Sequence, residues 1–236
     1  MHKLSDAQRR ALEQLHVHLD HPAPAILTVE QLLTSSGTDR LLDTMKTLSQ
    51  APTPAVAASV FMRRYGFFLT ALLKLFSSEH IRWAGSLSDI AIRQTDHSIH
   101  FALSPAKFEK IRTANRSVEL RRILEQYGHP VVTQISPSAK ISTFILWENV
   151  WGYVLWMYAQ LFDDPVFRPQ AKADLSLLLE DELWKPNMRR SPFKHFLRNQ
   201  STEEAMREYK RVTCCLYKEL PGTDKCPYCP LVQKSP

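Results

Sequence analysis

The chain has 236 residues, of which 44% are hydrophobic and 23% charged, as is usual for a globular protein of one large or two small domains. Its formal net charge of +6 favours an anionic partner but lacks the dense basic stripes of a dedicated nucleic-acid binder, so no nucleic-acid partner is expected. A chain of this length buries a real core and needs neither metal nor disulfides in order to fold.

The first half of the chain has the pattern of several helices. Residues 5–20 have apolar residues at helical spacing, which predicts an amphipathic helix. Thr28 is placed to cap a second helix, which the stretch TSSGTDR, residues 34–40, interrupts before it resumes over 41–48. After a proline-containing loop, a long helix is predicted over 55–78.

The middle of the chain changes to a strand pattern. Residues 89–93 and 98–103 alternate in polarity around the turn-like tetrapeptide QTDH and predict a β-hairpin. Residues 105–127 return to a helical pattern that opens with a Ser-Pro cap. One more strand is predicted over 131–135, and a dominant helix rich in aromatic residues over 138–162.

Two shorter helices, over 174–183 and 202–209, lead into the C-terminal tail. We therefore expect an α+β fold, mainly helical, with a small antiparallel β-sheet and a C-terminal metal-binding loop. We divide the chain into a helical α+β domain, residues 1–200, and a metal-binding segment, residues 201–236.

The N-terminus, MHKLSDAQRRALEQL, lacks the apolar region of a secretory signal, so a cytoplasmic protein is expected. Residues 55–76 and 141–162 are apolar enough to be compared with membrane spans. Polar and charged residues interrupt both: Arg63, Arg64 and Lys74 in the first, Glu148 and Asn149 in the second. Both stretches are predicted to be helices buried in protein. No transmembrane segment is expected, and a peripheral membrane contact is left open without a specific signal.

Three histidines lie close together in HVHLDH: His16, His18 and His21. On a helix, His16 and His18 would point to different sides, and no further ligand is evident nearby. We expect all three to be surface residues.

All four cysteines lie in the stretch RVTCCLYKELPGTDKCPYC, in the pattern C-C-x10-C-x2-C: Cys214, Cys215, Cys226 and Cys229. In a reducing compartment this pattern is more typical of metal ligands than of disulfides. Cys226 and Cys229 form one zinc knuckle, but the adjacent side chains of Cys214 and Cys215 diverge, which suits two irons better than one ion. Spacing alone leaves zinc and an iron–sulfur cluster at about even odds.

The tail resembles the C-terminal signature of the FhuF-like ferric siderophore reductases, an adjacent cysteine pair followed by ten residues and C-x2-C. The matching residues beside the cysteines are Arg211, Thr213, Tyr217, Lys218, Leu220 and Pro221. ILWENVWGYVLWMY resembles the family's aromatic helix through its W-x-N core, Trp147 and Asn149. A weaker match is Leu183-Trp184, which basic residues follow.

The resemblance implies a cytoplasmic oxidoreductase in which the four cysteines bind a [2Fe–2S] cluster. The cluster passes one electron to the bound Fe(III) complex of a hydroxamate, catecholate or citrate-type siderophore, which then releases Fe(II). Only six glycines are present and none cluster, so the electron is expected from a separate donor such as a ferredoxin or a flavin reductase. Candidates for tuning the cluster or binding the substrate are Arg211, Lys218, Trp147, Asn149, Arg189 and Arg190. The alternative is a zinc-stabilised binding or adaptor module without redox activity.

Overall fold

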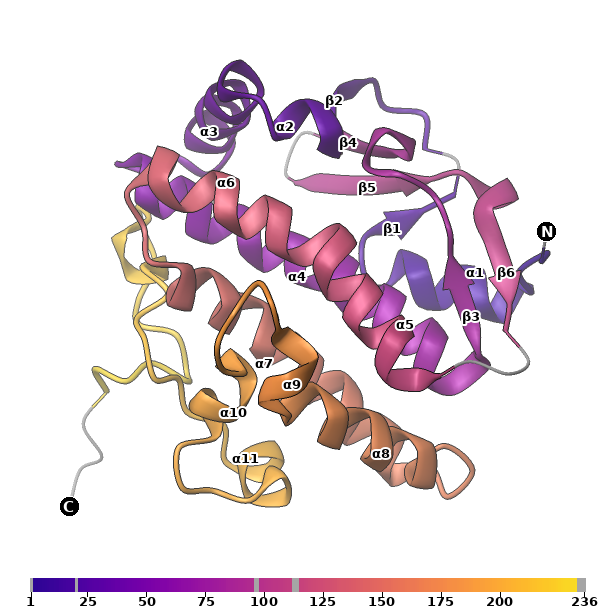
Figure 1. Cartoon of the computed structure of the whole chain (residues 1–236). Helices are drawn as coiled ribbons and strands as arrows, with labels where there is room; N and C mark the ends of the chain where they lie inside the picture. Colours follow the sequence, from indigo (N-terminus) through magenta and orange to yellow (C-terminus); the bar gives the residue numbers. More distant parts are fainter. Residues whose placement is uncertain (1, 20, 96–97, 112–114, 233–236) are drawn as a thin grey trace.

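The computed structural model describes residues 2–19, 21–95, 98–111 and 115–232. The fold is α+β and mainly helical. Its centre is a pair of long helices, α4 (Pro54–Glu79) and α7 (Thr143–Asp163), which pack on each other more extensively than any other two described elements. The helices α3 (Ser35–Ser49) and α6 (His129–Ala139) flank this pair, and Figure 1 shows α6 running alongside α4.

The helix α4 confirms the long helix predicted over 55–78. The Thr53 side chain caps it by accepting a hydrogen bond from the Val56 backbone N–H, and Pro54 occupies its first turn. Within the described residues it is the one helix long and apolar enough to cross a membrane, and 78% of its most apolar window is buried inside the protein. Such extensive burial is expected for a helix that is apolar on nearly all sides and lies in the core of a protein.

Four strands form a mixed sheet, in the order β1 (Val17–His18), β5 (Ile99–Leu103), β4 (Ile90–Gln94) and β2 (Ala25–Thr28). The antiparallel pair of β4 and β5 confirms the predicted hairpin, although Asp96 and His97 of its QTDH turn lie outside the described residues. The expectation of a purely antiparallel sheet is wrong, because β1 pairs parallel with β5. A separate antiparallel pair consists of β3 (Ile81–Trp83) and β6 (Phe108–Lys110).

The N-terminal helices differ from the prediction at their ends. The helix predicted over 5–20 is only α1 (Asp6–Glu13), because the chain turns at His16, which has a left-handed φ of 57°, and enters β1. Thr28 does cap α2 (Val29–Leu32). The predicted interruption over 34–40 is present but shorter: α2 ends at Leu32, and the Thr34 side chain accepts from the Gly37 backbone N–H and starts α3 at Ser35.

Two predictions in the middle of the chain are also wrong. The helix predicted over 105–127 begins as a 3-10 turn and β6, residues 112–114 lie outside the described residues, and the rest is helical over α5 (Arg116–Ile123) and the π-helical segment Leu124–Gly128. The strand predicted over 131–135 is part of α6, where its β-branched residues face the core at helical spacing. A short apolar run of valine and isoleucine fits either structure, and length decides between them.

The dominant helix predicted over 138–162 starts later, at Thr143, because Lys140 with a left-handed φ of 51° ends α6. The helix predicted over 174–183 is two helices, α8 (Arg168–Leu179) and α9 (Asp181–Trp184), separated at Glu180.

The C-terminal part adds α10 (Pro192–Leu197), which the sequence did not indicate, and α11 (Thr202–Arg207), slightly shorter than predicted. From Glu208 onward the described chain has little regular structure besides the 3-10 turn η4 (Tyr217–Glu219). This tail, drawn in yellow in Figure 1, lies beside the helices and apart from the four-stranded sheet. Contacts of η4 with α4 and of α11 with α7 bring the cysteines against the central pair.

Candidate metal centre and the adjoining cavity

A buried carboxylate on α7 holds the segment that precedes the cysteine pair. Glu148 is fully buried, and its carboxylate accepts hydrogen bonds from the backbone N–H groups of Val212 and Thr213, at 2.5 and 2.7 Å, and from the Thr213 hydroxyl. The Arg211 guanidinium completes the arrangement with an ion pair at 3.4 Å. An unpaired carboxylate in a protein interior costs a large amount of free energy. The carboxylate of Glu148 is therefore stable only while the segment Arg211–Thr213 is docked against it.

Arg211 connects the two halves of the cysteine motif. Its side chain is buried, with Nε donating to the Thr213 carbonyl at 3.1 Å and Nη1 donating to the Glu148 carbonyl at 3.4 Å. Its backbone N–H donates to the carbonyl of Tyr228, which lies between Cys226 and Cys229, at 3.0 Å. The residue that the sequence marked as a candidate for tuning the cluster is thus also a structural link across the loop.

Asn149 reaches the cysteine loop through a serine on α4. Its Nδ2 donates to the carbonyl and to Oγ of Ser59, at 3.0 and 2.9 Å. The Ser59 hydroxyl donates in turn to the Cys215 carbonyl at 2.6 Å, and all three residues are buried. Sequence reasoning missed Ser59, although a small polar residue in an apolar helix is a signal that its hydroxyl has a specific partner.

The spacer between the cysteine pairs folds back on itself. Gly222 has a left-handed φ of 69°, a conformation that glycine adopts without strain. The Thr223 hydroxyl donates to the carbonyls of Tyr217 and Leu220, at 2.6 and 3.0 Å, and so closes the turn that the Pro-Gly pair predicts. The turn brings Sγ of Cys215 to 3.8 Å from Sγ of Cys226.

The thiol geometry fits a metal centre. Two thiolates on one tetrahedral metal, at about 2.3 Å each, lie about 3.8 Å apart, which is the separation of Cys215 and Cys226. The Leu216 backbone N–H donates to Sγ of Cys214 at 3.4 Å, a contact of the kind that tunes cluster sulfurs. Burial and the neighbouring Cys215 raise the pKa of Cys226 to about 11, so a metal ion that binds this thiol has to displace its proton.

The four thiols do not all lie close enough together to form one compact group of ligand atoms. Across the described residues, the one group of three or more histidine, cysteine or carboxylate side chains whose ligand atoms all lie within 4.8 Å of one another consists of histidines elsewhere in the chain. The four thiols are therefore spread more widely than a single tetrahedral zinc ion requires, with edges of about 3.8 Å. A two-iron rhomb takes two thiolates at each end and allows longer distances between the ends.

A cavity of about 470 Å³ opens beside the thiols, and Cys215 and Cys226 form part of its wall. Three arginines and five aromatic residues also line it: Arg63, Arg207, Arg211, Phe67, Tyr153, Trp156, Tyr209 and Tyr228. No carboxylate side chain is among its described lining residues. Trp156 and Tyr228 are each 51% exposed. The cavity is thus cationic and aromatic, with large rings reachable from solvent.

Several polar atoms of the cavity residues have no partner among the described residues. These atoms are Nη1 of Arg63, Oδ1 of Asn149 and the hydroxyl of Tyr209. The rest of the Arg63 side chain is fixed, because Nε donates to the Tyr153 hydroxyl at 3.4 Å and the guanidinium lies 4.7 Å from the centre of the Tyr217 ring. Burial raises the pKa of Tyr209 well above its usual value, so its hydroxyl keeps its proton. Two donors, Nη1 of Arg63 and the Tyr209 hydroxyl, are therefore buried at the cavity wall without a partner among the described residues.

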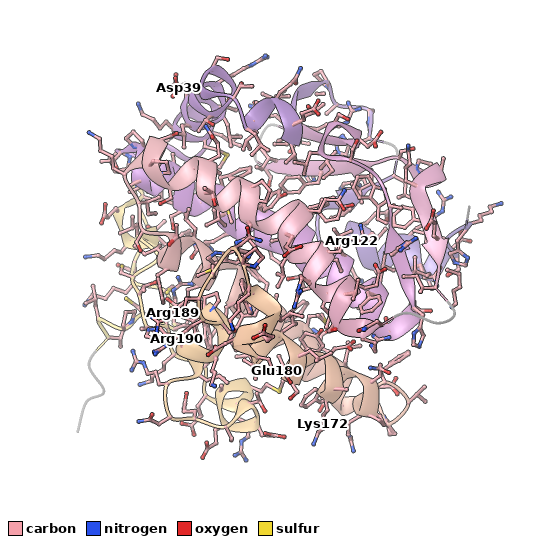
Figure 2. The ribbon with its side chains drawn as sticks, in the orientation of Figure 1. Asp39, Arg122, Lys172, Glu180, Arg189 and Arg190 are labelled. Carbon is pink, nitrogen blue, oxygen red and sulfur yellow. The ribbon has the colours of Figure 1, made fainter. Side chains whose placement is uncertain are left out.

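The remaining predicted site residues lie outside this cavity. Trp147 is buried in the core, where its ring packs edge-on against Trp184 with 5.0 Å between the ring centres. The W-x-N motif and the Leu183-Trp184 pair, which both resemble the FhuF-like reductases, are therefore in contact there. Arg189 and Arg190 are exposed in the loop after α9 and do not line the cavity (Figure 2). Lys218 is exposed in η4, and its charge is one of the smaller influences on the pKa of Cys214, which burial raises.

Sequence reasoning missed Arg63, which the structure brings to the cavity wall. In the sequence, Arg63 served only as evidence that the apolar stretch 55–76 does not span a membrane. A charge in such a helix is also a signal of a polar site, since burying it requires a partner.

No protein-family model matches this chain. No curated protein matches it either. The functional assignment therefore rests on the residues themselves and on their geometry.

Proposed function

We propose that this chain is a cytoplasmic ferric-siderophore reductase with a [2Fe–2S] cluster on Cys214, Cys215, Cys226 and Cys229. The observation that carries the proposal is the cationic, aromatic cavity whose wall includes two of these cysteines. A molecule in this cavity lies in contact with the thiols that would hold the cluster, which is the short distance that electron transfer requires. The resemblance of the tail to the FhuF-like reductases supports the same function.

The reaction needs one electron and no acid or nucleophile from the protein. The cluster would supply that electron, received from a separate donor such as a ferredoxin or a flavin reductase, and Fe(III) in the substrate would become Fe(II). Fe(II) binds hard oxygen donors less tightly than Fe(III), so the complex loosens. The chain's own part is to hold the four thiols in place through Glu148, Arg211 and Ser59, and to bind the substrate against them.

The lining residues favour an anionic substrate. Arg63 and Arg207 line the cavity and attract negative charge, and guanidinium groups pair well with carboxylate or phenolate oxygens. The Trp156 and Tyr228 rings offer flat apolar surface for the rings of a catecholate. The volume lies within the usual range of small-molecule sites. Among the three chelate types, we therefore expect catecholate and citrate-type ferric complexes to be reduced faster than neutral hydroxamate complexes.

The test is the visible absorption spectrum of anaerobically purified protein, followed by reduction assays. We expect a red-brown protein with two irons and two sulfides per chain, whose bands bleach on reduction and recover when a ferric catecholate is added with a ferrous trap. Cys226→Ser should abolish turnover while circular dichroism stays native. A colourless protein with one zinc ion per chain would overturn the proposal and favour the zinc-stabilised adaptor.

A further inference from the structure

The three N-terminal histidines do not lie on a helix exposed to solvent, as the sequence suggested. The chain leaves α1 at Glu13 and turns at His16, and His18 lies in strand β1. His16, His18 and His21 are all half-buried. The expectation that they are surface residues of a helix is therefore wrong, because the chain turns at His16 and the helical pattern does not show this turn.

The sheet register brings a fourth histidine to this place. β1 runs parallel to β5, with His18 opposite Ala102. Neighbouring residues of a strand point to opposite faces, so His100 lies on the same face as Ala102 and away from the buried Phe101. His18 and His100, 82 residues apart in the sequence, therefore meet on one face of the sheet.

Three of these imidazoles converge. Nε2 of His18 lies 3.1 Å from Nδ1 of His100. The ligand nitrogens of His18, His21 and His100 all lie within 4.8 Å of one another. Nitrogens on one tetrahedral metal, at about 2.1 Å each, lie about 3.4 Å apart. One pair already has nearly this separation, and a small rotation of a ring brings in the third.

A second layer of contacts orients His100. Its Nε2 lies 3.4 Å from the Thr95 hydroxyl, and that hydroxyl donates to the Ser98 carbonyl at 3.2 Å. Thr95 therefore accepts from Nε2–H of His100, which leaves the lone pair on Nδ1 facing His18. A metal-binding imidazole is usually fixed by a hydrogen bond at its other nitrogen in this way.

His21 is the ligand that has to adjust. Its Nδ1 accepts a hydrogen bond from the Ala23 backbone N–H at 3.2 Å. A metal ion held by His21 either replaces that N–H at Nδ1 or binds Nε2 after the ring has turned. In both cases one weak hydrogen bond is exchanged for a metal bond.

The charges around the group decide which ions it accepts. Arg93 lies opposite His100 on β4 and opposes a cation, as Arg64 does, whereas Glu13 acts in the opposite direction. Among the described residues the group holds three imidazoles and no carboxylate, a set that does not suit Ca²⁺ or Mg²⁺, whereas imidazole is a preferred ligand of first-row transition metals.

We propose that His18, His21 and His100 form a second metal site that binds one divalent transition-metal ion, such as Zn²⁺, Co²⁺ or Ni²⁺, with a fourth position open to water or another ligand. The site is independent of the proposed reductase function. It is close to the cavity nevertheless: His16, which packs edge-on against His100, also contacts Phe67, and Phe67 stacks on Tyr153 with 4.0 Å between ring centres. Phe67 and Tyr153 both line the cavity wall.

The experiment is a titration of the full chain with Co²⁺ and Zn²⁺, followed by Co²⁺ absorption and calorimetry, in a background where all four cysteines are serine. We expect one ion per chain with a tetrahedral Co²⁺ spectrum. Replacement of His18 or His100 by glutamine should weaken binding at least about tenfold, since each removes one of three ligands. His16→Asn is the matched control, because asparagine tolerates the left-handed backbone and the imidazole it removes is not a ligand.

Circular dichroism of each variant separates loss of the site from loss of the fold. If the cysteine-free chain does not fold, the same titration is made on the wild-type protein with its cysteine-bound metal in place, and one additional ion is expected. Absence of any additional equivalent, or His100→Gln binding as tightly as His16→Asn, would overturn the proposal.

Discussion

The cysteine group and the histidine group are two sets of candidate metal ligands assembled in opposite ways. The cysteines come from one short segment, and buried polar residues of α4 and α7 hold that segment by its backbone. Two of the histidines, His18 and His100, come from the parallel strands β1 and β5, whose register brings them together, and His21 comes from the segment that follows β1. The first depends on a few long-range hydrogen bonds, and the second on the hydrogen-bond ladder of the sheet. Mutations should therefore affect the two groups separately.

Glu148→Ala gives the largest expected effect. It leaves the Val212 and Thr213 N–H groups and the Arg211 guanidinium without their buried acceptor, which costs about 3–5 kcal/mol of unfolding free energy. We expect bound iron to fall to near zero, as measured by iron analysis and urea unfolding, while the histidine group still binds Co²⁺. Glu182→Ala is the control, because Glu182 forms only an exposed pair with Lys185. Retention of full iron content would contradict the role of Glu148.

His129 gives a prediction that distinguishes acid unfolding from acid loss of metal. Burial lowers the pKa of His129 to about 4, so this group stabilises the fold above its unfolded pKa of about 6.5 and loses that stabilisation as pH falls toward 4. The loss reaches about 3 kcal/mol at about 1.4 kcal/mol per pKa unit. Fluorescence of Trp147 and Trp184, which pack on His129, would follow unfolding. His129→Gln should flatten the pH dependence between these values; an unchanged slope would assign acid unfolding to other groups.

Arg63→Gln tests the cavity without disturbing either metal group. Removal of a charge-assisted hydrogen bond, worth about 1.5–3 kcal/mol, should raise KM for an anionic ferric complex about ten- to hundredfold, with the cluster spectrum unchanged. The change in KM is measured by steady-state reduction of ferric catecholate and ferric citrate. The matched controls are Arg189→Gln and Arg190→Gln, exposed arginines that do not line the cavity. Equal effects of all three variants would mean that only net charge matters.

Asn149→Ala has the smallest expected effect. It removes two hydrogen bonds to Ser59 and so loosens the contact of Ser59 with the Cys215 carbonyl, at a cost of about 1–2 kcal/mol. We expect lower cluster occupancy, measured by visible absorbance, and a slower reductase rate, measured by turnover. Ser59→Ala should reproduce most of the loss, and the double variant should add little to it. Full occupancy and rate in Asn149→Ala would refute the role of this residue in ordering the loop.

The parts of the molecule that were predicted correctly have local signals. The helix α4 has a capping threonine, a proline and a long apolar run, and the hairpin of β4 and β5 has a clear alternation. The cysteines are close in sequence, so their grouping is visible there, while the identity of their metal stays a prediction. Arg211 and Asn149 were singled out by resemblance, and their contacts could not be read from the sequence.

The parts that were missed depend on contacts between distant residues. Val131 and Ile135 fit a strand as well as a helix until the neighbouring helices fix their environment. Nothing near HVHLDH indicates that His100 lies beside it, because only the parallel pairing of β1 with β5 brings them together. The length of α1 was overestimated because a left-handed residue such as His16 leaves no mark on the hydrophobic pattern.

The hydrogen bonds of Glu148 have a consequence for how the protein matures. They connect the core helix to backbone N–H groups of the tail, and none of them involves a thiol. The tail can therefore dock as soon as α7 is in place, before any metal binds. If the proposed cluster forms, it would be inserted into a loop that is already docked, and its loss would leave the docking contacts intact.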